Sequence, residues 1–246
     1  MNSAVRDETP GPSTQNNTRC VLIVEDEPDI AAVMRMTLER EGFATEWCAR
    51  GEDALQRIQA GGIDLIILDI ILPGIDGHEV CRRIRAADET RVLPIIMLTS
   101  LVEETDMIVG FELGADDYVR KPYSAAELVA RTRAALRCRS QLSSQNDRRV
   151  LRFGSLEIDA ARHRVQVDGQ TTHLTLAEYR LLLFLASNFG QAFTRQELLP
   201  HVVGEGVFVI DRNIDVHVRN VRKKLGPSAH YIVTVRGIGY RFDAET

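Results

Sequence analysis

Short strand-like segments alternate with amphipathic segments over the first 138 residues. The strand-like segments lie at 21–24, 44–48, 64–69, 94–99 and 116–119. A helical pattern follows each of them, beginning after Pro28, from Glu52, from Gly77, from Glu104 and from Ser124. Several of these strands are apolar along their whole length, which is typical of parallel strands covered by helices on both faces. The pattern predicts an α/β domain with a doubly wound, five-stranded parallel sheet.

The pattern changes near residue 150. Three short alternating strands are expected, at 153–159, 163–167 and 172–174. An Asp168-Gly169 hairpin turn separates the last two. Two helices begin with capping boxes and a third with an aspartate cap, at Thr175, Thr194 and Asp211. Two strands around Gly237 and Gly239 complete a winged helix-turn-helix domain of the α+β class.

Charge divides the chain at the same place. Residues 21–138 carry 13 Lys and Arg against 22 Asp and Glu, a net charge of −9, whereas residues 150–246 carry 12 against 10, a net charge of +2. The segment between them is polar, rich in Ser and Gln and without hydrophobic periodicity, as flexible linkers are. We therefore expect a disordered tail at 1–19, an acidic domain at 20–138, a linker at 139–149 and a basic domain at 150–246.

Composition limits the class of protein. Hydrophobic residues make up 44% of the 246 residues and charged residues 26%, which favours a soluble globular chain over a disordered or collagen-like one. The apolar runs are far shorter than the roughly 18 residues that span a bilayer, and residues 1–19 do not have the pattern of a secretory signal. The four cysteines form no C-x-x-C pair. We expect reduced thiols, a cytoplasmic location and no membrane association.

Polar side chains lie where the predicted parallel strands end. The first strand is followed by Glu25 and Asp26, the third ends in Asp69, the fourth ends in Thr99, and Lys121 comes just after the fifth. Ligands of open parallel sheets bind at this carboxyl edge. Three neighbouring carboxylates need a cation, and oxygen ligands without His or Cys favour Mg²⁺. An aspartate that ends a strand is usually only a turn residue, but the polar groups at the matching strand ends favour a functional site.

Seven sequence blocks together indicate a family. VLIVEDEPD, LDIILPGIDGHEV, IIMLTS and GADDYVRKPY occur in order in the first domain. LTLAEYRLLLFLASNFGQAFTRQELL, DRNIDVHVRNVRKKLG and YIVTVRGIGYRF follow in the second. Through these blocks the chain resembles OmpR/PhoB-type two-component response regulators over nearly its whole length beyond the tail. The resemblance implies a flavodoxin-like receiver domain followed by a winged-helix DNA-binding domain.

The resemblance also implies a role for each residue of the carboxyl edge. Asp69 is the implied acceptor of a phosphoryl group from a phosphohistidine of a sensor histidine kinase, and Thr99 and Lys121 contact that group. The implied ligands of Mg²⁺ are Glu25, Asp26, Asp69 and the backbone carbonyl of Ile71. Phosphorylation draws Thr99 inward, and Tyr118 fills the space behind it as a switch. Taken singly, Tyr118 is as readily explained as a packing residue.

Relatives form dimers through the fourth helix, the fifth strand and the fifth helix. The resemblance implies cross-subunit salt bridges of Asp117 with Arg131 and of Glu127 with a basic residue of the fourth helix. This chain departs from that pattern, because Met107 stands where the basic residue usually lies and Cys138 replaces another. An apolar part of the face still favours a two-fold homodimer. The implied interface residues are Met107, Ile108, Phe111, Asp117, Glu127 and Arg131.

The helix expected at 211–225 has an apolar stripe and a cationic face. The apolar positions follow helical spacing and are Ile214, Val218, Val221 and Leu225. A cationic face alone is more often only solvated, so it is the resemblance that favours insertion into the major groove of promoter DNA. The implied DNA contacts are Arg212, His217, Arg219, Asn220, Arg222 and Lys223 on this helix, with Thr234, Arg236 and Tyr240 on the terminal hairpin.

Two positions of the second domain depart from the family pattern. Some relatives carry an arginine that reads guanine at the position of Asn220, whereas asparagine pairs with adenine. Val203 replaces a tryptophan that is common in the loop at 200–210, the segment that relatives offer to RNA polymerase. His217 taken alone is as readily explained as a buried, hydrogen-bonded residue.

These observations predict a transcription factor, not an enzyme beyond autophosphorylation from small phosphodonors and autodephosphorylation. A kinase would phosphorylate Asp69, the receiver would form a homodimer, and two winged helices would bind adjacent promoter half-sites. One alternative is a regulator that binds DNA constitutively and uses its receiver as a dimer or ligand module. Another is a phosphatase with Asp69 as nucleophile, although no D-x-D-x-T pattern begins there.

Overall fold

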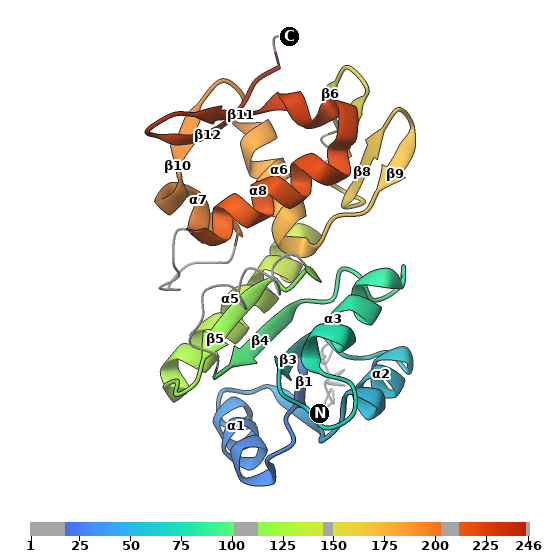
Figure 1. The fold of residues 1–246 in the computed structure, drawn as a ribbon, viewed down its shortest axis with the longest axis vertical. Coiled ribbons are helices and arrows are strands. Elements are labelled where there is room, and N and C mark those ends of the chain that lie inside the picture. The colour runs from blue at the N-terminus through green and yellow to red at the C-terminus, as the bar shows by residue number, and fades with distance from the viewer. Residues whose placement is uncertain (1–17, 101–112, 145–149, 203–211, 245–246) are drawn as a thin grey trace, which may run out of the picture.

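The computed structural model describes residues 18–100, 113–144, 150–202 and 212–244 (Figure 1). The first domain contains a five-stranded sheet with the strand order β2-β1-β3-β4-β5, and all neighbouring strands run parallel. The strands are β1 (Cys20–Val24), β2 (Ala44–Cys48), β3 (Leu65–Asp69), β4 (Ile95–Thr99) and β5 (Asp117–Arg120). Each lies within one residue of its predicted bounds, and the predicted fold class is confirmed.

Helices cover both faces of this sheet. They are α1 (Pro28–Arg40), α2 (Gly51–Gln59), α3 (Gly77–Ala86) and α5 (Ala125–Ser144). Because alternate strand residues face opposite sides, Leu22 and Ile66 pack with α2 and α3, whereas Ile23 and Ile67 pack with α1 and α5. The helix predicted from Glu104 falls in 101–112, outside the described residues.

The fifth helix is longer than the sequence pattern indicated. α5 has 20 residues and ends at Ser144, so it runs into the segment expected to be a linker, 139–149. Ser and Gln lower helix propensity only slightly, and they are tolerated in a helix that has already formed. Hydrophobic periodicity, which the segment lacks, therefore did not mark where the helix ends.

The second domain begins with a four-stranded antiparallel sheet in the order β6-β7-β8-β9. Its strands are β6 (Val150–Phe153), β7 (Leu156–Asp159), β8 (Arg164–Val167) and β9 (Gln170–Thr172). The prediction of one strand at 153–159 was wrong, because Gly154 adopts φ +52° and turns the chain between β6 and β7. The predicted hairpin turn is confirmed, with positive φ at both Asp168 and Gly169.

The rest of the second domain is a winged helix-turn-helix. Its helices are α6 (Leu176–Ser187), α7 (Arg195–Val202) and α8 (Arg212–Leu225), followed by a 3-10 helix, Gly226–Tyr231. Its second sheet has the order β10-β12-β11 and contains β10 (Ala192–Thr194), β11 (Ile232–Val235) and β12 (Gly239–Phe242). Thr175 and Glu178 form the predicted capping box of α6. The sequence pattern missed β10, and α7 continues to Val202, past the expected loop start at Pro200.

Within the described ranges, no helix is both long enough and apolar enough to cross a membrane.

Candidate functional site

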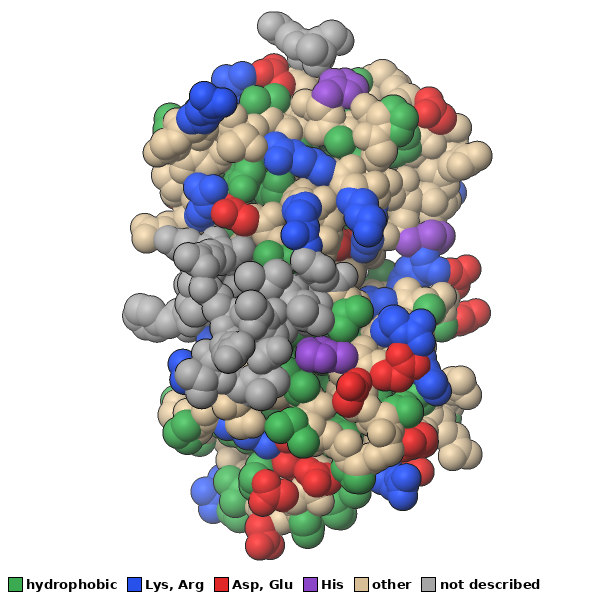
Figure 2. Space-filling model, viewed as in Figure 1, with side chains coloured by type: hydrophobic (Ala, Val, Ile, Leu, Met, Phe, Trp, Pro, Cys, Tyr) green, Lys and Arg blue, Asp and Glu red, His purple; other side chains and the backbone are tan. Residues whose placement is uncertain are grey.

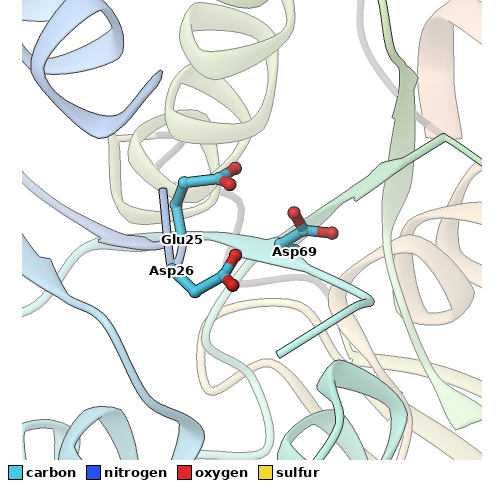
Figure 3. A group of neighbouring side chains, drawn as sticks. All are labelled: Glu25, Asp26 and Asp69. Atoms are coloured by element: carbon cyan, nitrogen blue, oxygen red, sulfur yellow. The ribbon is translucent and has the colours of Figure 1, made fainter. Parts of the chain in front are cut away.

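Three carboxylates meet at the carboxyl end of the parallel sheet (Figure 3). Glu25 and Asp26 directly follow β1, and Asp69 is the last residue of β3. A carboxylate oxygen of each lies within 4.8 Å of the others. Glu25 is fully buried, Asp69 is 5% exposed, and Asp26 is exposed to solvent. The strand order, which puts β1 beside β3, is what brings these residues together from distant parts of the sequence.

Lys121 connects two of these carboxylates. Its Nζ lies 2.6 Å from Oδ2 of Asp69 and 2.8 Å from Oε2 of Glu25. The other oxygen of Asp69, Oδ1, accepts a hydrogen bond of 3.0 Å from the backbone amide of Ile71. Asp69 is thus held at both oxygens.

This site has an excess of negative charge that a cation would neutralise. Burial raises the pKa of Glu25, against the effect of its hydrogen bond from Lys121. Burial alone would lower the pKa of Lys121, but its hydrogen bonds to Asp69 and Glu25 raise the pKa. The site contains three carboxylates, and the ammonium group of Lys121 contacts two of them. Oε1 of Glu25 is buried without a hydrogen-bond partner among the described residues. A hard divalent cation such as Mg²⁺ suits this oxygen donor set.

The start of α3 fixes the backbone of Asp69. A Cβ atom on Gly77 would lie 2.1 Å from the backbone oxygen of Asp69, so only glycine allows the helix to approach this closely. The amide of Gly77 donates to the carbonyl of Ile70 at 2.9 Å, and Asp76 caps the helix by accepting from the amide of Glu79. Sequence reasoning missed this role of Gly77, although the Asp-Gly pair at a predicted helix start was a usable signal.

Two further residues of the predicted site lie at the neighbouring strands. Thr99 is the buried last residue of β4. Tyr118 lies in β5, is buried, and donates a hydrogen bond of 3.0 Å from its hydroxyl to Sδ of Met97. Tyr118 therefore packs against β4 at Met97, which lies two residues before Thr99.

The predicted dimer residues that are described bind one another within one chain. Both Oδ atoms of Asp117 accept a hydrogen bond of 2.9 Å from Arg131, and Arg131 also forms a salt bridge of 2.9 Å with Glu127. Asp117 and Arg131 are buried, because α5 packs directly against β5. The expected cross-subunit pairs of these residues stay a prediction. The other predicted interface positions, Met107, Ile108 and Phe111, lie outside the described residues.

The DNA-binding surface expected on α8 divides into three groups of residues. The apolar stripe is confirmed, since Ile214, Val218, Val221 and Leu225 are buried in the core of the second domain. Figure 2 shows Lys and Arg side chains on the face of this domain that carries α8. The predicted contacts that are exposed are Arg219, Lys223, Thr234 and Arg236, whereas the side chain of Arg212 lies outside the described part.

A second group connects α8 to the terminal hairpin. Arg222 donates to the carbonyl of Ile232 and to Oγ1 of Thr234, each at 2.8 Å, and its guanidinium lies over the ring of Tyr240. The hydroxyl of Tyr240 donates to Asp215 at 2.7 Å. Arg222, Thr234 and Tyr240, three of the implied DNA contacts, therefore also hold the hairpin in place.

The third group is buried, although the resemblance implies that both of its residues contact DNA. His217 is 1% exposed and Asn220 is 8% exposed. Val216, beside His217 on α8, lies in the same apolar cluster as Ala115 and Tyr118 of the first domain. Val216 is therefore buried against the first domain.

Known proteins resemble the chain over both domains. Residues 21–133 match the response regulator receiver domain, and residues 169–242 match the family described as transcriptional regulatory protein, C terminal. The chain is 43% identical over 237 residues to the transcriptional regulatory protein ResD of Bacillus subtilis (strain 168), covering 93% of this chain and 98% of ResD.

Two further relatives agree. The phosphate regulon transcriptional regulatory protein PhoB of Rhizobium meliloti (strain 1021) is 43% identical over 227 residues, covering 91% of this chain and 98% of PhoB. A solved structure of a RitR mutant superimposes with a TM-score of 0.72 at 26% identity, covering 91% of this chain and 98% of RitR. The chain belongs to the OmpR/PhoB family of two-component transcriptional response regulators.

Proposed function

We propose that phosphorylation of Asp69 switches this regulator into a form that binds adjacent promoter half-sites as a homodimer. The observation that carries the proposal is the setting of Asp69, which is buried at a strand end, close to two other carboxylates and 2.6 Å from an ammonium group. Phosphoryl transfer needs mainly positioning and neutralisation of oxygen charge, and this setting supplies both.

The phosphodonor would be a phosphohistidine of a sensor histidine kinase. An oxygen of Asp69 would attack the phosphorus and form an acyl phosphate, while the N–P bond breaks and the imidazole nitrogen keeps the electron pair. Lys121 would bind one phosphoryl oxygen, and the Thr99 hydroxyl would donate to another. Bound Mg²⁺ would supply the remaining positive charge. Its ligands would be Glu25, Asp26, Asp69 and the carbonyl of Ile71.

Turnover would be limited to this site. Water would hydrolyse the acyl phosphate on Asp69 slowly, which is autodephosphorylation, and small phosphodonors such as acetyl phosphate would replace the kinase. The family consists of DNA-binding regulators, which disfavours the alternative of a phosphatase acting on other substrates. The regulator would act in the cytoplasm, where it meets both DNA and the kinase domain.

Contacts between the domains support a coupling of phosphorylation to DNA binding. Tyr118, the proposed switch, and Val216 of α8 are buried in one apolar cluster. A movement of Tyr118 would disturb that cluster and free α8 for the major groove, with Asn220 then reading adenine. Arg236 of the terminal hairpin would approach the minor groove. Most phosphate contacts would come from Arg212, His217, Arg219, Arg222, Thr234 and Tyr240. The 200–210 loop would be available to RNA polymerase.

Phosphorylation of purified protein tests the acceptor. Incubation with acetyl phosphate and Mg²⁺ should add one phosphoryl group to the wild type and none to Asp69→Asn, measured by intact-mass spectrometry. Equal labelling of both proteins would refute the assignment. Light scattering on the same samples should show a dimer only after phosphorylation.

DNA footprinting at fixed salt distinguishes the switch from the constitutive alternative. We expect protection to extend to adjacent half-sites at a lower protein concentration after phosphorylation. An affinity that phosphorylation leaves unchanged would favour a constitutive DNA-binding regulator.

A further inference from the structure

Trp47 lies on the edge strand β2 and reaches the carboxylate site from the side. Its neighbour in the β1–β2 register is Ile23. Alternate residues of a strand share a face, so Glu25, two residues after Ile23, lies on the same face as Trp47. The indole Nε1–H donates a hydrogen bond of 2.8 Å to the backbone carbonyl of Glu25.

This hydrogen bond comes where the strand ladder stops. The last paired residues of the two strands are Val24 and Cys48, and the amide of Glu25 still donates to the carbonyl of Cys48 at 3.1 Å. The carbonyl of Glu25 lies beyond that pair, and the indole supplies a donor to it. A buried carbonyl without a partner is costly, so the contact has a structural reason as well.

The peptide that the indole holds joins two of the three carboxylate residues. The carbonyl of Glu25 and the amide of Asp26 belong to one rigid plane. Lys121 binds Glu25 and Asp69 directly, whereas Asp26 is exposed to solvent. The orientation of the peptide therefore sets the direction in which Asp26 leaves the backbone.

We infer that Trp47 is a positioning residue for metal binding by Glu25, Asp26 and Asp69, an inference that rests on the proposed magnesium site. Second-layer hydrogen bonds that orient metal ligands contribute to metal affinity in the same way. In this role Trp47 restrains the backbone that carries two of the ligand carboxylates.

Titration calorimetry with MgCl₂ on the full-length chain tests the inference. Trp47→Phe removes the N–H donor and should bind Mg²⁺ about fivefold more weakly than wild type, the effect of one neutral hydrogen bond. Thr45→Val is the matched control. Thr45 lies on the same strand and face, and its hydroxyl contacts Arg35 and Glu39 of α1, away from the site. This control should bind Mg²⁺ as wild type does.

A second variant separates the N–H group from the ring. Trp47 is the only tryptophan in the chain, so growth on benzothienylalanine replaces it alone with a ring of nearly the same shape in which sulfur takes the place of N–H. This protein should show the same weakening as Trp47→Phe. With acetyl phosphate, both should need more Mg²⁺ for half-maximal phosphorylation yet reach the wild-type rate at saturating Mg²⁺.

Equal Mg²⁺ affinity in wild type, Trp47→Phe and the benzothienyl protein would overturn the role of Trp47. Failure of the proposed metal site gives a different result. In that case, Asp26→Asn would bind Mg²⁺ as tightly as wild type, or wild type would bind none.

Discussion

Asp116 of the receiver accepts a hydrogen bond of 3.2 Å from the backbone amide of Ala177, at the start of α6 in the second domain. Its other oxygen binds Arg85 at 2.7 Å and the amide of Ile95 at 2.9 Å. The first amides of a helix lack partners within the helix and carry partial positive charge, which favours a carboxylate at this position. One side chain therefore joins the two domains.

Asp116→Asn should weaken this connection selectively. Asparagine has a single acceptor oxygen, and if it keeps the bonds to Arg85 and Ile95, its NH₂ group faces the amide of Ala177 donor to donor. We expect the unphosphorylated variant to bind operator DNA about fivefold more tightly than wild type, because α8 would be released from its contact with the receiver more often. Fluorescence anisotropy at fixed salt measures this. An unchanged affinity, with normal phosphorylation of Asp69, would contradict the prediction.

Lys121→Ala should separate phosphorylation from metal binding. The rate of phosphorylation by acetyl phosphate should fall on the order of 100-fold, because a preorganised positive charge at the phosphoryl group is lost. Mg²⁺ affinity should rise, since the ammonium no longer competes for the carboxylates of Asp69 and Glu25. Calorimetry measures the Mg²⁺ affinity of the variant, and mass spectrometry measures its rate of phosphorylation. A fall in Mg²⁺ affinity would count against the proposed ligand set.

Gly77→Ala should destabilise the receiver and slow its phosphorylation. The added Cβ meets the backbone of Asp69, so either α3 or the end of β3 must move, at a cost of about 2 kcal/mol or more. Gly42→Ala is the control. Gly42 has φ +87° but open space around its Cβ position, so only backbone strain of about 1 kcal/mol is expected. Urea unfolding and phosphorylation rates distinguish the two, and equal effects would exclude a specific role for Gly77.

Cys81 should resist alkylation in the folded protein. Burial raises the pKa of its thiol to about 11. The thiolate is the reactive form, so its fraction stays low through neutral and mildly alkaline pH and rises only as the pH approaches that value. At a mildly alkaline pH of about 8, iodoacetamide should leave Cys81 unmodified in buffer and modify it in urea, as peptide mass spectrometry will show. Rapid modification of the folded chain would show that α3 opens readily.

Local patterns in the sequence were sufficient for the architecture and for the residues at the strand ends. Glu25, Asp69 and Lys121 are brought together by the strand order of the sheet. Apolar strands alternating with helices predict parallel strands, and the family resemblance implies their flavodoxin-like order. The ion pair of Asp117 with Arg131 within one chain could not be anticipated in this way. The resemblance implies partners in another subunit, whereas the pair within one chain depends on the packing of α5 on β5.

Other features depend on contacts that no local pattern encodes. Trp47 donates a hydrogen bond to the backbone carbonyl of Glu25. Every residue has such a carbonyl, so the sequence does not show which one accepts this hydrogen bond. Val216 of α8 is buried in one cluster with residues of the first domain, whereas periodicity describes each helix alone. A three-residue strand such as Ala192–Thr194 is shorter than the run of about four residues over which alternation indicates a strand.

Strand β4 has the carboxylate site at one end and the domain contact at the other. It runs from Ile95, whose amide binds Asp116, to Thr99, a strand of 5 residues that spans about 16 Å. Mutations that tune the domain contact therefore need not alter the phosphorylation chemistry, and the reverse also holds. Substitutions at the domain contact could therefore change the DNA affinity of the unphosphorylated protein during evolution while the phosphorylation reaction stays the same.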